Sequence, residues 1–316
     1  MATLQTVETR DTGTNFPAGK AYFETSTNKF IVWNGTQWIE LHSDGTGSAF
    51  INDYSVSFTH GKYLTTNYSH IPNGTDYSFS MSYWIRLNSQ DYSRNTGLSP
   101  TIGSNNAGAG GFYLLQASSV HNSFPNGLIL AWYTTAGQPA NSGWAPESLG
   151  GIGAAAPLGD GEWHHIALTV ASDGINKKVY FDGGDSIITA SNASNNAGSP
   201  FATVTGSAYG GSRSGFSYKI GSFQNDYYGL DGNFDEIAFF ETELSGSDVA
   251  AIYNGGLPDS LTAYNPAALF RMGDDDSDSP VDGGSVASIT DSSGNGYTAT
   301  QATASIQPTF STSVPS

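Results

Sequence analysis

The sequence contains no cysteine, so none of its 316 residues can form a disulfide bond or supply a reactive thiol. The absence does not decide between an oxidising and a reducing compartment.

Basic residues are scarce as well. Eleven Lys and Arg against 28 Asp and Glu give a net charge of -17, and a field of that sign repels phosphate backbones and anionic lipid. We therefore expect no nucleic-acid partner. No apolar run approaches the roughly 20 residues that span a bilayer, so we expect no membrane partner either. Residues 1–6 lack the basic and apolar segments of a secretory signal.

Glycine and aromatic residues are plentiful. The chain has 39 Gly, 13% aromatic residues and only 12% charged residues. Surface helices usually carry many Glu and Lys, whereas strands and turns favour aromatic residues and glycine. This composition predicts an all-β protein, and the length is sufficient for one large sandwich with additional segments.

The stretch 161–258 has the clearest pattern. Apolar and polar residues alternate over 163–170, and a turn with Asp173 and Asn176 leads into a second strand over 178–181. Further strands are predicted over 218–222 and within 229–240. Upstream, 111–115 and 127–133 are predicted as central strands, and 136–156, which shows no clear period, as a long loop.

A short helix closes this stretch. Ser245 followed by Asp248 predicts a capping box with Asp in place of the usual Glu. Val249, Ile252 and Tyr253 have the spacing of one buried helical face, and Asn254 begins a glycine-rich helix end.

These segments carry a family resemblance. GEWHHIALTV, KKVYFDGG, YKIGSF and GLDGNFDEIAFFETELSGSDVAAIYNGG resemble the second half of a laminin-G-like domain of the concanavalin A-like lectin/glucanase superfamily. Residues 54–64 and 77–85 resemble the first half. The resemblance implies a jelly roll of two antiparallel sheets, so we expect a concanavalin A-like β-sandwich over 48–258.

Residues 1–43 are predicted to form a separate β-meander of three short strands with a small aromatic core. GKAYFETSTNKFIVWNGTQWIEL resembles hairpin modules at the N-termini of bacteriophage tail and other virion proteins. That resemblance implies attachment to other virion proteins and assembly as a homo-oligomer. The alternative is an extra hairpin laid on the sandwich. The candidate attachment residues are Tyr22, Phe30, Trp33 and Trp38.

The C-terminal extension, 259–316, contains a strand-like segment at 268–273 and the sequence DSSGNG at 291–296. DSSGNG is similar to the segment that normally opens a laminin-G-like domain, yet here it follows the body. Either the extension packs back and supplies edge strands, which we favour, or it is the remnant of a further repeat. The sequences RMGD and FSTSVPS resemble the C-termini of structural proteins from marine tailed phages.

Two groups of acidic residues are candidate Ca²⁺ ligands. Asp231 and Asp235 resemble acids placed near a structural calcium in this superfamily, the alternative being turn capping. Asp274, Asp276 and Asp278 alternate in the manner of a calcium loop. That loop lacks the glycine and the final Glu which the motif requires, so a solvated acidic loop is the competing interpretation.

Loop aromatic residues are the candidates for contact with a glycan, because binding residues concentrate in long loops at the rim of a rigid sandwich. We select Trp144, Tyr133 and Tyr209. Tyr209 lies in a glycine-rich loop, 206–215, that lacks the features of a phosphate-binding loop. For Trp144 and Tyr133 the alternative is a place in the core.

Catalytic motifs are absent from the sequence. The acidic pattern of the related glucanases is missing, and His164 and His165 have no nucleophile motif beside them. We therefore expect a protein that is not an enzyme. Two hypotheses remain: a virion structural protein that displays a lectin-like domain toward host-surface glycans, and a free or cell-surface carbohydrate-binding module located outside the cell.

Overall fold

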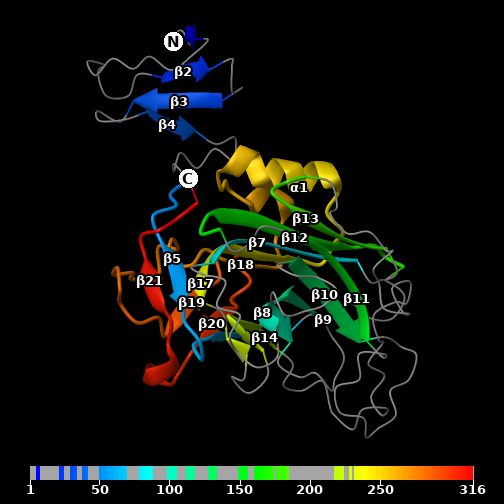
Figure 1. Cartoon of the computed structure of the whole chain (residues 1–316). Coiled ribbons are helices and arrows are strands. Elements are labelled where there is room, and N and C mark those ends of the chain that lie inside the picture. Colours follow the sequence, from blue (N-terminus) through cyan, green and yellow to red (C-terminus); the bar gives the residue numbers. More distant parts are fainter. Residues whose placement is uncertain are drawn as a thin grey trace, which may run out of the picture. The chain divides into compact units, whose positions relative to one another are not determined.

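The computed structural model describes residues 5–7, 21–24, 29–33, 38–41, 50–69, 78–87, 98–104, 112–117, 127–133, 149–155, 160–173, 176–184, 217–223, 228–229 and 231–315. The chain divides into two compact units, Met1–Ile51 and Asn52–Ser316 (Figure 1). Within the described part of the chain, no helix is long and apolar enough to cross a membrane.

The N-terminal unit is a four-stranded sheet in the order β1-β2-β3-β4. Strands β2 (Ala21–Glu24), β3 (Lys29–Trp33) and β4 (Trp38–Leu41) form the predicted antiparallel meander. Strand β1 (Gln5–Val7) pairs in parallel with β2 and was not predicted, because three mixed residues carry no strand period. Trp33 is buried, whereas the side chains of Tyr22, Phe30 and Trp38 lie outside the described residues.

The second unit is an all-β jelly-roll sandwich of two antiparallel sheets. The first sheet has the order β13-β12-β7-β17-β5-β21, and β18 also pairs with β17. Its strands are β13 (Lys177–Phe181), β12 (Trp163–Val170), β7 (Phe79–Leu87), β17 (Gly232–Phe240), β5 (Ser55–Phe58), β21 (Thr309–Ser311) and β18 (Ala268–Phe270).

The second sheet has eight strands in the order β11-β10-β9-β8-β14-β6-β20-β19. They are β11 (Leu149–Ala155), β10 (Gly127–Tyr133), β9 (Phe112–Ala117), β8 (Leu98–Ser104), β14 (Tyr218–Ile220), β6 (Leu64–Thr66), β20 (Thr298–Thr300) and β19 (Ser288–Thr290). A small pair, β15 (Ser222–Phe223) and β16 (Tyr228–Gly229), accompanies them. The predicted loop 136–156 therefore ends in a strand, β11, whose glycines concealed its period.

The core lies between the two sheets, and strand alternation explains which residues fill it. Along β7, Phe79, Met81, Tyr83 and Ile85 enter the main hydrophobic cluster, while the residues between them face away from it. Tyr68, Tyr218 and Phe239 stack within the same core. Burying each such side chain stabilises the fold by about 1.5–3 kcal/mol.

Helix α1 (Gly246–Tyr253) covers the outer face of the seven-stranded sheet (Figure 1). The predicted capping box is present: Ser245 Oγ accepts from the Asp248 amide, and the Asp248 carboxylate accepts from the Ser245 amide. Val249 and Ile252 pack into a second hydrophobic cluster that contains Ala167, Tyr180, Phe240, Leu244, Leu261 and Leu269. Asn254 ends the helix in the left-handed conformation.

The C-terminal extension packs back on the sandwich, as predicted, and contributes strands to both sheets. Strand β18 pairs with β17 and β21 with β5, whereas β20 joins the other sheet beside β6 and β19 follows it at the edge. Its short 3-10 helices are η4 (Thr262–Tyr264) and η5 (Ala304–Ile306), preceded by η3 (Asn254–Gly256) after α1. The extension is therefore part of the sandwich.

Candidate functional site

The central strand β17 contains a bulge that places two carboxylates close together. In the pairing with β7, Asp235 is opposite Trp84 and Ala238 is opposite Ser82, so β17 has one residue more than its partner. Glu236 lies in this bulge with φ 45°, a left-handed conformation that is uncommon for residues other than glycine. The bulge interrupts the strict alternation that would send Asp235 and Glu236 to opposite faces.

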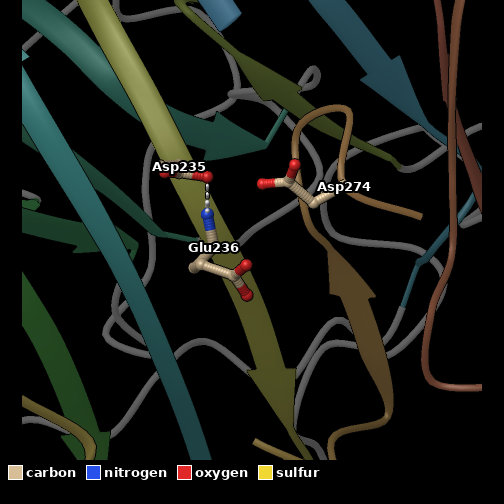
Figure 2. A group of neighbouring side chains, drawn as sticks. All are labelled: Asp235, Glu236 and Asp274. Carbon is tan, nitrogen blue, oxygen red and sulfur yellow. Dashed lines mark hydrogen bonds between the residues drawn. The ribbon is translucent and has the colours of Figure 1, made fainter. Parts of the chain in front are cut away.

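A third carboxylate, from Asp274 in the turn after β18, completes what we call the buried acid group: Asp235, Glu236 and Asp274. Each residue offers an oxygen within 4.8 Å of the oxygens offered by the others. Figure 2 shows the Asp274 carboxylate directed toward Asp235. Asp235 and Glu236 are 0% and 2% exposed, so this charge is almost entirely withdrawn from water.

Some oxygens of the buried acid group have hydrogen-bond donors. Arg271 Nε donates to Glu236 Oε1 over 2.9 Å. The amides of Asp53 and Tyr54 donate to the two Asp274 oxygens over 3.1 and 3.4 Å. Asp235 Oδ1 accepts from the Glu236 amide over 2.9 Å. One guanidinium therefore faces three carboxylates.

Other polar atoms at the site are buried and make no hydrogen bond. They include Asp235 Oδ2 and Glu236 Oε2. The Asn52 side chain lies beside Asp235 and lowers the pKa of that carboxyl as a hydrogen-bond partner. Buried polar atoms without partners are rare in folded proteins because each one costs free energy, so such atoms are expected to contact a bound water or ion.

The pKa values respond to this crowding. Burial raises the pKa of Asp235 well above its usual value, and the negative charges of Glu236 and Asp274 raise it further. Burial also raises the pKa of Glu236 to about 7, although Arg271 opposes the increase, and that of Asp274 to about 6. Without further positive charge, the three carboxylates cannot all ionise easily.

The chemistry of these residues fits a hard divalent cation. Calcium is bound by carboxylate and amide oxygens in flexible geometry, and the site offers three carboxylates, the Asn52 amide oxygen and several oxygens without donors. Asp235, Glu236, Asp274 and Asn52 would hold the ion, and a bound Ca²⁺ would supply the positive charge that the buried acid group lacks.

The sequence predicted two separate groups of Ca²⁺ ligands, and the structure brings one residue of each group into the buried acid group. Asp235 and Asp274 come together, whereas Asp231 precedes β17 and Asp276 is exposed. Asp278 Oδ1 accepts from the amide and the hydroxyl of Thr290, at 3.0 and 2.7 Å. Sequence reasoning missed Glu236. The one sequence feature that could have indicated Glu236 was its position next to Asp235. Neighbouring strand residues normally face opposite sides of a sheet, so both can reach one site only where the strand has a bulge.

The adjacent histidines have structural environments. His165 is fully buried, stacks near Trp84 and Tyr253, and its Nε2 lies 2.8 Å from Ser82 Oγ. His164 lies between two carboxylates, with Nδ1 2.9 Å from Asp182 Oδ2 and Nε2 3.1 Å from Asp160 Oδ1.

The strand register of the eight-stranded sheet aligns residues from five neighbouring strands. One line of paired residues crosses five strands of the eight-stranded sheet. In the strand order β6, β14, β8, β9 and β10, its residues are Thr65, Lys219, Gly103, Tyr113 and Ala131. Lys219 and Thr65 alternate with buried residues, so these two residues lie on the outer face of the sheet.

Tyr133 is the last residue of β10 and pairs with Leu149 of β11. Its side chain lies outside the described residues, so contact with a glycan and a place in the core both stay predictions for Tyr133. On the outer face of the sheet, Lys219 Nζ lies 3.9 Å from the centre of the Tyr63 ring. Trp144 and Tyr209 lie outside the described residues.

Comparisons with known proteins agree with this architecture. The family profile described as the concanavalin A-like lectin/glucanases superfamily matches residues 58–250, more than half of the chain. Among solved structures, the chain is similar to a proposed carbohydrate-binding protein from Bacteroides ovatus, with 14% identity, a TM-score of 0.51, and coverage of 95% of this chain and 71% of that one.

Two further similar structures have lower TM-scores. The heptameric pentraxin of Limulus polyphemus has a TM-score of 0.40 and 12% identity, covering 65% of this chain and 84% of that one. The carbohydrate-binding module CBM40 of a Ruminococcus gnavus sialidase has a TM-score of 0.41 and 11% identity, covering 63% and 97%. A search of curated proteins finds no match.

Proposed function

Since the chain belongs to the concanavalin A-like lectin/glucanases superfamily, we propose that its sandwich is a non-enzymatic carbohydrate-binding module displayed by a bacteriophage virion structural protein. The family supports the lectin-like part of this proposal. The N-terminal unit and the resemblances in the terminal segments support the virion part.

The observation that carries carbohydrate binding is the outer face of the eight-stranded sheet. Its paired line runs from Lys219 through the small residue Gly103 to Tyr113 and then to the small residue Ala131. Tyr133 is the last residue of β10. Small residues leave room for a flat sugar ring, and aromatic residues at such a surface bury its apolar side. Trp144 and Tyr209 complete the proposed set of glycan contacts.

The buried acid group supports binding rather than hydrolysis. A glycosidase needs two carboxylates that flank the scissile bond and touch the sugar. Asp235 and Glu236 are 0% and 2% exposed, and Glu236 is paired with Arg271. A saccharide cannot reach them without unfolding the strand. The Ser82–His165 pair is equally enclosed, so neither group is positioned to act on a glycan.

Calcium belongs to this proposal as a structural ion. It would bind at the buried acid group, below the protein surface, where it could stabilise the sandwich without contacting the sugar.

The virion part rests on residues 1–43. The N-terminal unit is compact in its own right, and its sequence resembles modules that attach proteins to phage particles. We propose that Tyr22, Phe30, Trp33 and Trp38 form its small core and docking surface, and that the protein assembles as a homo-oligomer on the particle. The alternative function, a free or cell-surface carbohydrate-binding module, is favoured by the family match, which carries no information about virions.

Binding of a glycan is tested with the full chain on a glycan array in the presence of calcium. We expect Tyr133→Ala and Trp144→Ala each to weaken binding roughly tenfold, the loss of one stacking contact. Tyr264→Ala is the matched control, because Tyr264 packs near α1 on the opposite sheet. No binding to any glycan, or equal binding by all variants, would contradict the proposed saccharide face.

The virion assignment is tested separately. The protein should be detected in purified phage particles, and deletion of residues 1–43 should abolish its incorporation while leaving glycan binding intact. Incorporation without those residues would overturn the docking role. Glycan binding by a protein absent from particles would favour the alternative function.

A further inference from the structure

The His164 side chain joins two turns that lie at the same end of strands β12 and β13. One turn, residues 160–162, leads into β12, and the other, residues 182–184, follows β13. His164 Nε2 lies 3.1 and 3.3 Å from the two Asp160 oxygens, and His164 Nδ1 lies 2.9 Å from Asp182 Oδ2. A single imidazole therefore bridges carboxylates from two segments.

Only the protonated ring can make both contacts as hydrogen bonds. An ionised carboxylate only accepts hydrogen bonds, and an imidazolium has an N–H on each ring nitrogen, whereas a neutral imidazole has one N–H. When the ring is neutral, its other nitrogen turns a lone pair toward a carboxylate. Loss of one proton therefore breaks one of the two links.

We propose that His164 is a clamp that is closed when its ring is protonated and half-open when the ring is neutral. In the closed state the imidazolium fastens the turn 160–162 to the turn 182–184. In the half-open state the proton of Nε2 has passed to water, so the ring releases Asp160 and keeps its hydrogen bond to Asp182. The inference does not depend on whether the sandwich binds a glycan.

The Asp182 side of the clamp is fixed by several contacts. Asp182 Oδ1 accepts from the His165 amide over 2.8 Å, and the Asp182 amide donates to the His165 carbonyl oxygen over 2.9 Å. Gly183 packs so closely on Tyr253 that a Cβ atom there would lie 2.6 Å from the Tyr253 ring. The turn 182–184 therefore has little freedom to move, and Nδ1 keeps its acceptor.

The Asp160 side of the clamp is held more weakly. The Asp160 side chain is 42% exposed, compared with 28% for Asp182, so water can replace the imidazole as its donor. Within its own turn, the only contact of the Asp160 carboxylate that the structure describes is with the Glu162 amide, which donates to Oδ1 over 2.9 Å. Asp160 is therefore the partner that the neutral ring releases.

The charges at the clamp favour its closed state. Burial tends to lower the pKa of His164, but its hydrogen bonds to Asp182 and Asp160 and their negative charges outweigh burial and raise it. Burial tends to raise the pKa of Asp160, but hydrogen bonds from the Glu162 amide and from His164 keep it below the usual value. Asp160 therefore stays ionised while His164 titrates, and the clamp opens as the pH rises.

The other elements around the clamp bring no charge that titrates near neutral pH among the described residues. In β7, Ile85 is the residue opposite His164, and the Phe181 ring of β13 stacks on the imidazole at 4.6 Å. Burial and the Asp182 carboxylate raise the pKa of Tyr253, at the end of α1. Burial lowers the pKa of His165 to about 4. Both side chains are therefore uncharged in the range where His164 titrates.

The experiment follows the full chain by NMR, with ¹⁵N-labelled histidine, from about pH 5 to about pH 9. We expect the neutral His164 ring to carry its proton on Nδ1. The Glu162 amide reports on Asp160, and its hydrogen exchange, corrected for the intrinsic effect of pH, should accelerate at least about fivefold as the ring loses its proton. The His165 amide reports on Asp182 and should change by less than about twofold.

Two variants test the link to Asp160. Asp160→Asn should lower the pKa of His164 and remove the pH dependence of Glu162 exchange, because a side-chain amide can accept from the imidazolium and donate to the neutral ring. Glu162→Gln is the matched control, since the Glu162 side chain is exposed in the same turn, and it should titrate as the unmodified chain does. The dispersion of the NMR spectrum checks that each variant is folded.

The proposal is overturned if the neutral His164 ring carries its proton on Nε2. It is also overturned if the corrected exchange of the Glu162 amide is the same at both ends of the titration. The same holds if Asp160→Asn keeps the pH dependence of the unmodified chain.

Discussion

Asp274 and Asp275 are neighbours in the sequence but have opposite environments. Asp274 belongs to the buried acid group, where its charge faces two other carboxylates. Asp275 accepts from the Ser277 amide and the Ser292 hydroxyl, over 2.9 and 2.7 Å. Burial tends to raise the pKa of Asp275, but these hydrogen bonds keep it below the usual value, whereas the pKa of Asp274 rises to about 6.

Asp291 is a second carboxylate that, like Asp275, is surrounded by hydrogen-bond donors. Its Oδ1 accepts from the amides of Leu269 and Ser293, and its Oδ2 accepts from the Ser293 hydroxyl and the Tyr297 amide. Asp291 is 6% exposed, compared with 0% and 2% for Asp235 and Glu236. The comparison shows that donors from neighbouring segments surround one buried carboxylate, whereas Glu236 keeps a buried oxygen without a hydrogen bond. The density of acidic residues in the sequence does not decide which carboxylates receive donors.

The largest effect is expected from Asp291→Ala. The substitution leaves the amides of Leu269, Ser293 and Tyr297 without their acceptor in a largely buried place, and we expect a loss of about 3 kcal/mol in the free energy of unfolding. Urea denaturation in EDTA measures it. Asp276→Ala, at an exposed position, should change this value by less than about 0.5 kcal/mol. Equal losses in the two variants would refute the loop-organising role of Asp291.

The second effect is smaller and has the opposite sign. Without metal, Asp235→Asn removes a buried charge but keeps the shape of the side chain and an oxygen that can accept from the Glu236 amide. We expect the free energy of unfolding in EDTA to stay constant or to rise by about 1 kcal/mol. With saturating calcium, the unmodified chain should become the more stable of the two. If Asp235→Asn lowered the free energy of unfolding in EDTA as much as Asp291→Ala does, the proposed difference between these two carboxylates would be wrong.

The fold was more predictable than the site because its signals are periodic or local. Alternation identified β12 and the core strands, and Ser245 with Asp248 identified the start of α1. Strand β11 escaped detection because three of its seven residues are glycine and its sequence shows no apolar alternation. Strand β1 is too short to carry a period.

The acid group could be predicted only in part because it depends on the tertiary structure. Asp235 and Asp274 were candidates in two separate groups, and no local rule joins positions 39 residues apart. Glu236 was missed because alternation assigns it to the face opposite Asp235, and the bulge that overrides alternation has no signature in the sequence. Donors from distant segments also decide which acid oxygens are paired: Ser292, for example, donates to Asp275 Oδ2 across 17 positions.

The smallest effect is expected for His164 and His165. These residues are neighbours in the sequence, and their hydrogen-bond partners determine the direction in which the pKa of each imidazole shifts. Burial lowers the pKa of both imidazoles. For His164 the hydrogen bonds that its ring nitrogens donate to the Asp182 and Asp160 carboxylates outweigh burial and raise the pKa above 6.5, whereas the His165 ring has no carboxylate partner and its pKa falls to about 4. A raised pKa means that the folded state holds the proton more tightly than the unfolded chain does.

His164 should therefore stabilise the fold fully below pH 6.5 and lose that contribution as the pH rises through its raised pKa. His165 acts in the opposite direction, because the unfolded chain takes up its proton between pH 6.5 and about 4 while the folded state resists. We expect His164→Gln to cost roughly 1 kcal/mol at pH 5.5 and less at pH 8.5. Urea denaturation at both pH values measures the cost, and a cost that grows with pH would mean that Asp160 and Asp182 do not hold an imidazolium.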